Sequence, residues 1–377
     1  MRGKAPGAGL IPEEGPRSIL VVMMSAVGDA VQVLPVLNAL KRRYPDTHIT
    51  WLIQPGPHEL VGGHPSVDRF VLFRRQGHGR NPMALLRSAR YLRETTQRLR
   101  ATAEDLPGGQ FDLVLDLQAY FKAGLLTALA PGRVKVGFDF RRARDLNWLF
   151  TTHRIPSPPG RFAHTQDQYL EFLRFLGVDP EPITYRLEPT EEEREAQARF
   201  FGPLERRACG VVLATSNSRK DWHGRGYREV VEALVERFGL QPVLLGKGSP
   251  REQEMARQVL EGARAPVLNA MQPNLRRLLW LLEGCALVIS PDTGPLHMAR
   301  ALEVPVIGLY GYTNPRRSGP YGRFGDLVVD GYARHPGERY PLNAVRRMGG
   351  MDRISPGMVL EKVELAMKKY AGKSTER

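Results

Sequence analysis

Three short polar stretches hold the side chains of this sequence that could do chemistry. They are Ser25-Ala26-Val27-Gly28-Asp29, the loop from Thr215 to Trp222, and Asp292-Thr293-Gly294, which is followed by His297. Each comes after an apolar run typical of a buried strand and before a helical pattern. A helix start leaves backbone N–H groups free and carries the positive end of the helix dipole, so it favours an anion such as phosphate. The sequence therefore predicts chemistry at strand-to-helix turns.

The turn at Asp292 is suited to a diphosphate. Thr293, Gly294 and the amides that follow would form its cradle, because an apolar helical pattern begins at Leu296. The alternative is that Asp292 or Thr293 merely caps this helix. In the second loop Lys220 could neutralise a phosphate that carries leaving-group charge, or it could be an ordinary surface lysine.

The turn at Asp29 offers a carboxylate instead of a cation. Gly28 allows close approach of a substrate, and Asp29 could either act as a general base or cap the helix that follows. This turn is not a Gly-x-Gly-x-x-Gly fingerprint, and no Walker sequence occurs anywhere. The sequence therefore argues against an enzyme of hydride transfer and against a P-loop enzyme of phosphoryl transfer.

A further loop after a strand could hold a nucleoside. Gly246 and Gly248 leave room for a base or a ribose, and Glu252 could accept hydrogen bonds from ribose hydroxyls.

Alternating strands and helices position these turns. Strand patterns lie at 18–24, 49–53, 67–73, 111–117, 134–138, 209–214, 242–246, 287–289 and 304–310. Helical patterns lie at 30–43, 82–106, 122–130, 165–176, 191–200, 227–238, 251–260, 275–282, 296–302 and 355–370. Such alternation predicts right-handed βαβ units and an α/β fold with two Rossmann-like domains. Because ligands bind at the carboxyl ends of parallel strands, we expect the two sheets to face each other across a central cleft, with Asp29 opposite Asp292.

The domain boundaries follow from composition. Residues 1–17 are expected to form a flexible tail, 18–180 the first domain, 181–207 a linker that begins Pro-rich, 208–350 the second domain and 351–377 a terminal helical segment. Pro35 lies inside the first helical pattern, so we expect that helix to start or bend there.

Composition narrows the class of protein. The chain has 377 residues with 54 Lys and Arg against 40 Asp and Glu, a formal net charge of +14 that favours anionic partners. Many arginines lie at 74–100 and 133–154, where solvated helix faces are the plain interpretation. No apolar run is long enough to span a membrane. Cys209 and Cys285 lie in apolar runs, which predicts buried thiols and no metal site.

The motifs together resemble those of the lipopolysaccharide heptosyltransferases, glycosyltransferase family 9. The resemblance rests on five stretches, which follow one another in the family's order. They are 19–29 with Leu34-Pro35 and 40–45, Lys220-Asp221-Trp222, 290–297, 305–310 with 313–315, and Gly319-Pro320-Tyr321-Gly322. It implies a GT-B fold, an acceptor site in the N-terminal domain and a nucleotide-sugar site in the C-terminal one. It also implies that the terminal helix packs back on the N-terminal domain.

The resemblance implies roles for single residues. Asp29 would deprotonate the acceptor hydroxyl, with Ser25 and Gly28 beside it, and Lys220 would stabilise the departing ADP. The donor would be held by Thr215, Ser216, Lys220, Glu252, Asp292, Thr293, Gly294 and His297. Three departures from the family pattern lie beside this site: Ala26, His223 and Tyr312.

The expected activity is an inverting, metal-independent transfer of a heptose from an ADP-sugar to the inner core of lipopolysaccharide or a similar envelope glycan. We expect no cofactor, an anionic glycolipid as acceptor, and a cytoplasmic enzyme peripheral to the inner membrane. One alternative is a GT-B enzyme that uses a UDP-sugar, or a nucleotide-sugar epimerase. Another is a basic nucleic-acid-binding protein, although the arginine-rich segments lack interleaved aromatic residues, so no nucleic-acid partner is expected.

Overall fold

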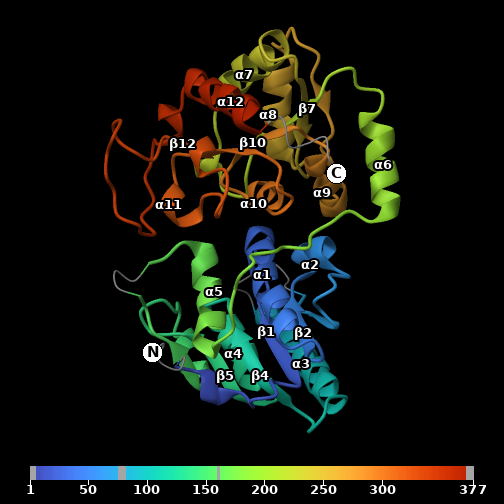
Figure 1. The fold of residues 1–377 in the computed structure, drawn as a ribbon, viewed down its shortest axis with the longest axis vertical. Coiled ribbons are helices and arrows are strands. Elements are labelled where there is room, and N and C mark those ends of the chain that lie inside the picture. The colour runs from blue at the N-terminus through green and yellow to red at the C-terminus, as the bar shows by residue number, and fades with distance from the viewer. Residues whose placement is uncertain (1–5, 75–81, 159–161, 371–377) are drawn as a thin grey trace. The chain divides into compact units, whose positions relative to one another are not determined.

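The computed structural model describes residues 6–74, 82–158 and 162–370. The chain divides into two compact units, Met1–Arg186 and Leu187–Arg377. Figure 1 shows the first unit in blue to green and the second toward red. The boundary between the units falls within the predicted linker. Across the described residues, no helix is both long and apolar enough to cross a membrane.

Unit 1 is built on a fully parallel sheet with the strand order β3-β2-β1-β4-β5-β6. Its strands are β1 (Ser18–Val22), β2 (His48–Ile53), β3 (Arg69–Leu72), β4 (Phe111–Asp116), β5 (Gly132–Phe138) and β6 (His153–Ile155). In this register Ile19 lies beside Ile49 on one side and Leu113 on the other. The strand order reverses between β1 and β4, which places the turn after β1 at the switch point where such sheets bind ligands.

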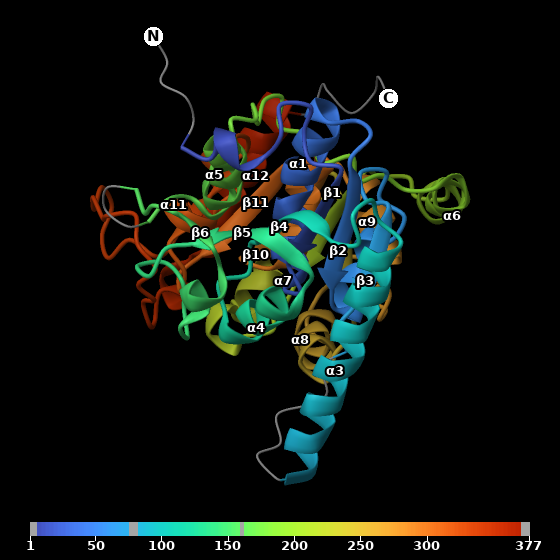
Figure 2. The same cartoon turned by 90° about the horizontal axis from the view of Figure 1, so that it is seen from below.

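Helices cover this sheet. They are α1 (Val27–Arg43), α2 (Pro55–Val61), α3 (Pro82–Glu104), α4 (Phe121–Leu129) and α5 (Thr165–Leu176), with 3-10 turns at Ala8–Leu10 and Asn147–Phe150. α1 packs against α2 and α5, whereas α3 contacts α4. Leu20, Leu99, Phe111 and Leu126 belong to the apolar core that joins α3 and α4 to the strands. Figure 2 shows that one end of α3 extends beyond the strands of its sheet.

Unit 1 differs from the sequence prediction in several places. α1 begins at Val27 and runs through Pro35, so the prediction that the helix starts at this proline is wrong. α2 and β6 were not predicted, because both are short. Within the arginine-rich stretch 74–100, residues 75–81 lie outside the described residues. The described arginines of α3 form an exposed face, as expected: Arg87, Arg90, Arg93, Arg98 and Arg100.

The described part of the expected tail is packed. The Gly7 amide donates to the carbonyl of Phe175 at 2.9 Å, Ile11 is buried, and the Thr47 hydroxyl donates to the carbonyl of Pro16. The expectation of a loose tail is therefore wrong for residues 6–17. A few apolar contacts and backbone hydrogen bonds suffice to hold a segment that has no periodic pattern of its own.

Unit 2 repeats the architecture with the strand order β12-β11-β10-β7-β8-β9. Its strands are β7 (Ala208–Val212), β8 (Gln241–Leu245), β9 (Leu268–Asn269), β10 (Leu287–Pro291), β11 (Val306–Tyr310) and β12 (Val329–Asp330). Its helices are α6 (Glu191–Phe201), α7 (Gly224–Glu236), α8 (Pro250–Leu260), α9 (Leu275–Glu283), α10 (Gly294–Ala301), α11 (Pro315–Ser318) and α12 (Pro356–Tyr370). Three 3-10 turns complete it at Ser218–Lys220, Gly325–Leu327 and Met351–Arg353. Cys209 and Cys285 are buried and unpaired, as expected, and burial raises the pKa of the Cys285 thiol to about 12.

The terminal helix is anchored within unit 2. α12 contacts α7, β11 and β12, and the 3-10 turn at Gly325–Leu327. Lys369 pairs with Asp326 at 2.7 Å, and the Tyr370 hydroxyl donates to the same carboxylate at 2.9 Å. These contacts place α12 in unit 2. Its packing against the N-terminal domain, which the resemblance implied, stays a prediction.

Candidate active site

Asp292 is the centre of the polar site in unit 2. It follows β10 directly, it is buried, and its Oδ2 accepts hydrogen bonds from Lys220 Nζ at 2.8 Å and Thr313 Oγ1 at 2.7 Å. Lys220 Nζ also donates to the Asp292 carbonyl at 3.0 Å, and Ser318 Oγ lies 3.4 Å from Oδ2. His297 Nε2 is 3.8 Å from Oδ1. The carboxylate therefore gathers donors from four separate elements or loops.

This environment keeps Asp292 ionised. Burial by itself would raise the pKa of the carboxyl, but the hydrogen bond from His297 and the charge of Lys220 outweigh it and hold the pKa well below its usual range. A buried carboxylate of this kind cannot lie against a diphosphate without repulsion. Its geometry suits it to fix the position of Lys220, whose ammonium remains partly exposed.

The start of α10 is free of side-chain caps. Thr293 is the N-cap residue in extended conformation, and its side chain makes no capping hydrogen bond. The Asp292 carboxylate is engaged by Lys220 and Thr313 instead. The simple interpretation that Asp292 or Thr293 caps this helix is therefore wrong. Gly294 at the first helical position presents its backbone without a side chain, as an anion cradle requires.

The loop that carries Lys220 is fixed at both ends. The Thr215 amide donates to Asp221 Oδ1 at 2.7 Å, and Arg251 pairs with the other oxygen of Asp221 at 3.1 Å. Trp222 is buried and donates through Nε1 to the carbonyl of Ile354 at 3.0 Å. Ser216 lies between these anchors and is exposed. Lys220 is thus carried by a short, well-anchored 3-10 turn, which limits the ways in which its ammonium can move away from Asp292.

Two further cations, one of them the chain neighbour of Lys220, lie at Tyr312. Arg219 Nη1 is 3.4 Å from the Tyr312 hydroxyl, and the guanidinium of Arg346 lies 5.8 Å from the centre of the Tyr312 ring. The hydrogen bond from Arg219, with the charges of both arginines, lowers the pKa of Tyr312. Neither arginine forms an ion pair with a carboxylate among the residues that the structure describes. Their charge is available to an anion next to Lys220.

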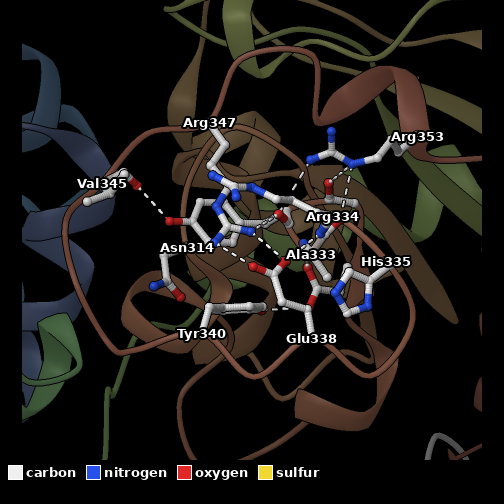
Figure 3. A network of polar contacts seen from close by, with 12 residues as sticks. Asn314, Ala333, Arg334, His335, Glu338, Tyr340, Val345, Arg347 and Arg353 are labelled. Atoms are coloured by element: carbon white, nitrogen blue, oxygen red, sulfur yellow. Dashed lines mark hydrogen bonds and ion pairs between the residues drawn. The ribbon is translucent and has the colours of Figure 1, made fainter.

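The irregular segment after β12 is held by a polar network, drawn in Figure 3. Arg347 makes two hydrogen bonds to Glu338, at 2.8 and 3.0 Å, and its guanidinium lies over the rings of Tyr332 at 4.2 Å and Tyr340 at 5.3 Å. The hydrogen bond from Arg347 lowers the pKa of Glu338 to about 2. The Arg347 amide donates to the carbonyl of Tyr312 at 3.0 Å, so this network also positions Tyr312.

The nucleoside loop has a structural role of its own. Ser249 and Glu252 form a reciprocal capping box at the start of α8: the Ser249 amide donates to Glu252 Oε2 at 2.8 Å, and the Glu252 amide to Ser249 Oγ. Gly246 and Gly248 both have positive φ angles, of 157° and 74°, which a larger residue would adopt only with strain. Glu252 is thus a cap in the structure, and its contact with a ribose stays a prediction.

In unit 1, Asp29 lies in the first turn of α1, where its two oxygens have different partners. Oδ2 accepts from the Ala26 amide at 3.0 Å, and Oδ1 accepts from the Tyr169 hydroxyl of α5 at 2.9 Å. The capping interpretation of Asp29 is confirmed, and it leaves room for a second role because the carboxylate is only half-buried. Ala26 has no hydroxyl that could accept a hydrogen bond from the Asp29 amide. This departure from the family pattern therefore leaves only one of the two hydrogen bonds of a capping box.

A side chain from the loop after the neighbouring strand β4 fixes the rest of this turn. Gln118 Oε1 accepts from the Ser25 amide at 3.1 Å, and Gln118 Nε2 donates to the Ser25 carbonyl. Gly28 is buried. The acceptor-side residues predicted from the sequence, Ser25, Gly28 and Asp29, therefore lie in one turn that Gln118 supports from the loop after β4.

Sequence reasoning missed several partners of the predicted residues. Tyr169, Gln118, Thr313 and Ser318 contact Asp29, Ser25 or Asp292 from other parts of the chain. Thr313 lies within a motif of the resemblance and could have been found there. The other three carry no local signal, because only the tertiary structure brings them to the site.

Comparison with known proteins shows the family to which the chain belongs. Residues 99–335 match the family model of glycosyltransferase family 9 (heptosyltransferase). The chain is 27% identical to the lipopolysaccharide core heptosyltransferase OpsX of Haemophilus influenzae, over 84% of this chain and 85% of that protein. It is 31% identical to lipopolysaccharide heptosyltransferase 1 of Salmonella typhimurium, over 81% of this chain and 92% of the relative.

A solved structure extends the likeness to the fold. The Escherichia coli heptosyltransferase WaaC with ADP-2-deoxy-2-fluoro heptose superposes with a TM-score of 0.64 at 25% identity, covering 92% of this chain and 99% of that one. The two parallel six-stranded sheets thus form the GT-B fold that the sequence predicted.

Proposed function

Because this chain belongs to glycosyltransferase family 9, we propose that it transfers a heptose from an ADP-sugar to the inner core of lipopolysaccharide, with inversion at the anomeric carbon. Two relatives named for lipopolysaccharide heptose transfer, and a similar structure that holds an ADP-heptose analogue, support the choice of donor and acceptor class. They favour it over a UDP-sugar enzyme, an epimerase or a nucleic-acid-binding protein.

The site in unit 2 would serve the leaving group. As the bond from the sugar to the diphosphate breaks, negative charge grows on ADP, and Lys220 with the amides at the start of α10 would stabilise it. Asp292 would hold Lys220 in place without touching the diphosphate, which revises the role implied by the resemblance. Thr293, Gly294 and His297 would border the sugar-diphosphate, and Thr215, Ser216 and Glu252 would lie toward the nucleoside.

The site in unit 1 would serve the acceptor. Asp29 would take the proton from the acceptor hydroxyl while its oxygen attacks the anomeric carbon. The hydrogen bond from Tyr169 would keep the free lone pairs of Asp29 aimed away from α5. In this proposal no divalent ion is needed, because Lys220, Arg219 and Arg346 offset the charge of the diphosphate.

The single observation that carries the proposal is the Lys220–Asp292 pair beside an uncapped helix start. Calorimetric binding of ADP, UDP and GDP to the wild type and to Lys220→Ala tests it, with Lys368→Ala as a control for removing an exposed lysine. We expect selective ADP binding that weakens about ten-fold or more in Lys220→Ala only. Equal binding by both variants would refute the role of Lys220, and a preference for UDP or GDP would refute the donor.

We also propose that the enzyme works in the cytoplasm, at the surface of the inner membrane, because its acceptor is a lipid-anchored glycan. The net charge of +14 suits an anionic lipid surface. Transfer to a lipid-embedded acceptor should then fall as salt is raised, while transfer to a delipidated acceptor changes less. Equal salt dependence for the two acceptors would contradict the proposal.

A further inference from the structure

One region of unit 1 exposes an unusual share of large apolar side chains. The described residues include eight exposed large hydrophobic side chains, and five of them come from residues 120–149. They are Tyr120, Phe121, Phe140, Leu146 and Leu149, which are 43–65% exposed and are together called the aromatic surface here. Contiguous apolar side chains on a soluble protein mark an interaction site.

Contacts within this region join the segments that carry the five side chains. The ring of Phe121 packs edge-on against Phe150 at 5.3 Å, which joins α4 to the 3-10 turn that carries Leu149. The Arg144 amide donates to the carbonyl of Ala119 at 2.8 Å, and Arg144 Nη1 lies 3.3 Å from the Tyr120 hydroxyl. The loop after β5 is therefore attached to the start of α4.

The surface is held in place by a buried carboxylate. Asp116, at the end of β4, accepts hydrogen bonds from Asn147 Nδ2 at 2.8 Å and Thr127 Oγ1 at 3.1 Å. Leu146 precedes Asn147 and has a φ of 62°, a conformation that is unfavourable for a branched side chain. The tether at Asn147 thus keeps Leu146 in a strained conformation in which its side chain points into solvent.

Cations surround the apolar side chains. Residues 119–154 contain seven Lys and Arg against two Asp. Lys122, Arg141, Arg144 and Arg154 are exposed, and Arg141 and Arg144 lie over the rings of Phe140 and Tyr120. Exposed aromatic and leucine side chains among arginines are the composition of proteins that insert into the headgroup region of a bilayer.

The aromatic surface adjoins the acceptor-side turn. Gln118, which fixes Ser25 through its side chain, is separated from Tyr120 by one residue. Phe140 follows the carboxyl end of β5, at the sheet edge that also carries Asp29. A bilayer in contact with this surface would present its lipid-anchored molecules at the edge where the acceptor must enter.

We propose that the aromatic surface docks unit 1 onto an anionic lipid bilayer, with Phe140, Leu146 and Leu149 inserted among the headgroups and Arg141 and Arg144 on lipid phosphates. This assignment deepens the proposed function, on which it rests for the identity of the acceptor, because it names the part of the chain that meets the membrane. The positive charge around the surface favours an anionic bilayer over a second copy of this chain. The cations around the aromatic surfaces of two copies would repel one another.

Co-sedimentation with vesicles tests the proposal on the full chain. Vesicles of phosphatidylglycerol and phosphatidylethanolamine are compared with vesicles of phosphatidylcholine alone, without acceptor or donor. We expect the wild type to sediment with the anionic vesicles, Phe140→Asp/Leu149→Asp to bind about ten-fold more weakly or worse, and Arg141→Glu/Arg144→Glu to lose its preference for anionic lipid. Met348→Asp is the matched control, since Met348 is 67% exposed and lies in unit 2.

The outcomes separate this proposal from the proposed function. If the aspartate variant sediments like the wild type, the aromatic surface is not the membrane contact, whatever the transfer activity. If the variant instead changes the oligomeric state in light scattering and keeps its vesicle binding, the surface is a contact between copies and the proposal is wrong. Support requires weaker vesicle binding together with an unchanged kcat on a water-soluble, delipidated acceptor and unchanged thermal unfolding. Failure of that acceptor with the wild type would instead refute the proposed function.

Discussion

At the scale of single residues, Asp29 is proposed as the general base, and Tyr169 positions it through a hydrogen bond. Variants of the two residues distinguish these roles. Asp29→Ala should abolish transfer to within a few per cent, because general base catalysis contributes about 10²- to 10⁴-fold. Tyr169→Phe should retain the base but let its carboxylate rotate, so kcat should fall about ten-fold with little change in the KM for the donor. Steady-state kinetics on a delipidated acceptor measures both. Near-full activity of the Asp29→Ala enzyme would contradict the assignment of Asp29 as the general base.

Glu252 can be tested against its own partner in the capping box. Ser249→Ala removes one side of the cap and should cost about 1 kcal/mol of stability, as should Glu252→Ala. If Glu252 also binds the ribose, only Glu252→Ala should raise the Kd for ADP, by about ten-fold. Thermal unfolding together with calorimetry distinguishes the two effects. Equal affinity for ADP in both variants would contradict ribose binding by Glu252 and would show that the residue only caps α8.

At the scale of elements, Asp116 joins β4 to the α4 helix and the Asn147 turn. Burial raises its pKa to about 6, although hydrogen bonds from Asn147, Gln118 and Thr127 oppose the shift. The folded pKa lies above the unfolded one of about 3.9, so the folded state binds the proton more tightly. The stabilisation is complete below about pH 4 and is lost as the pH rises through about 6.

Asp116→Asn should remove this dependence. Relative to that variant, the wild type should lose about 3 kcal/mol of unfolding free energy between about pH 4 and pH 6. Denaturant unfolding at several pH values across this window measures it. Asp105→Asn is the control, because Asp105 forms an exposed ion pair with Arg69 and should show a difference near zero. A difference that is constant across the window would contradict the burial of a titrating Asp116.

At the scale of the whole molecule, each unit has its own sheet and core. The donor residues Lys220, Asp292 and Gly294 all belong to unit 2. ADP at about 100 times its Kd should therefore stabilise unit 2 by about 2.7 kcal/mol. When ADP is added to the full chain, hydrogen exchange should slow in β10, in α10 and in the loop at Lys220. The Lys220→Ala variant should show less of this protection. Protection confined to unit 1 would contradict a donor site in unit 2.

The sequence by itself determined the two Rossmann-like units and their polar turns. Periodicity and strand-turn-helix chemistry are local properties, so the turns at Asp29, Lys220 and Asp292 could be found without a structure. The boundaries of α1 and the packing of residues 6–17 could not, because Pro35 is tolerated within a packed helix and the N-terminal segment has no periodic pattern.

Only the tertiary structure decided what each polar residue contacts. Lys220 meets Asp292 across 72 residues, and Tyr169 meets Asp29 across 140. It also assigned α12 to unit 2 and joined the exposed segments that carry Tyr120, Phe140 and Leu149. Such pairings depend on strand order and helix packing, which join distant segments through contacts that no local pattern encodes.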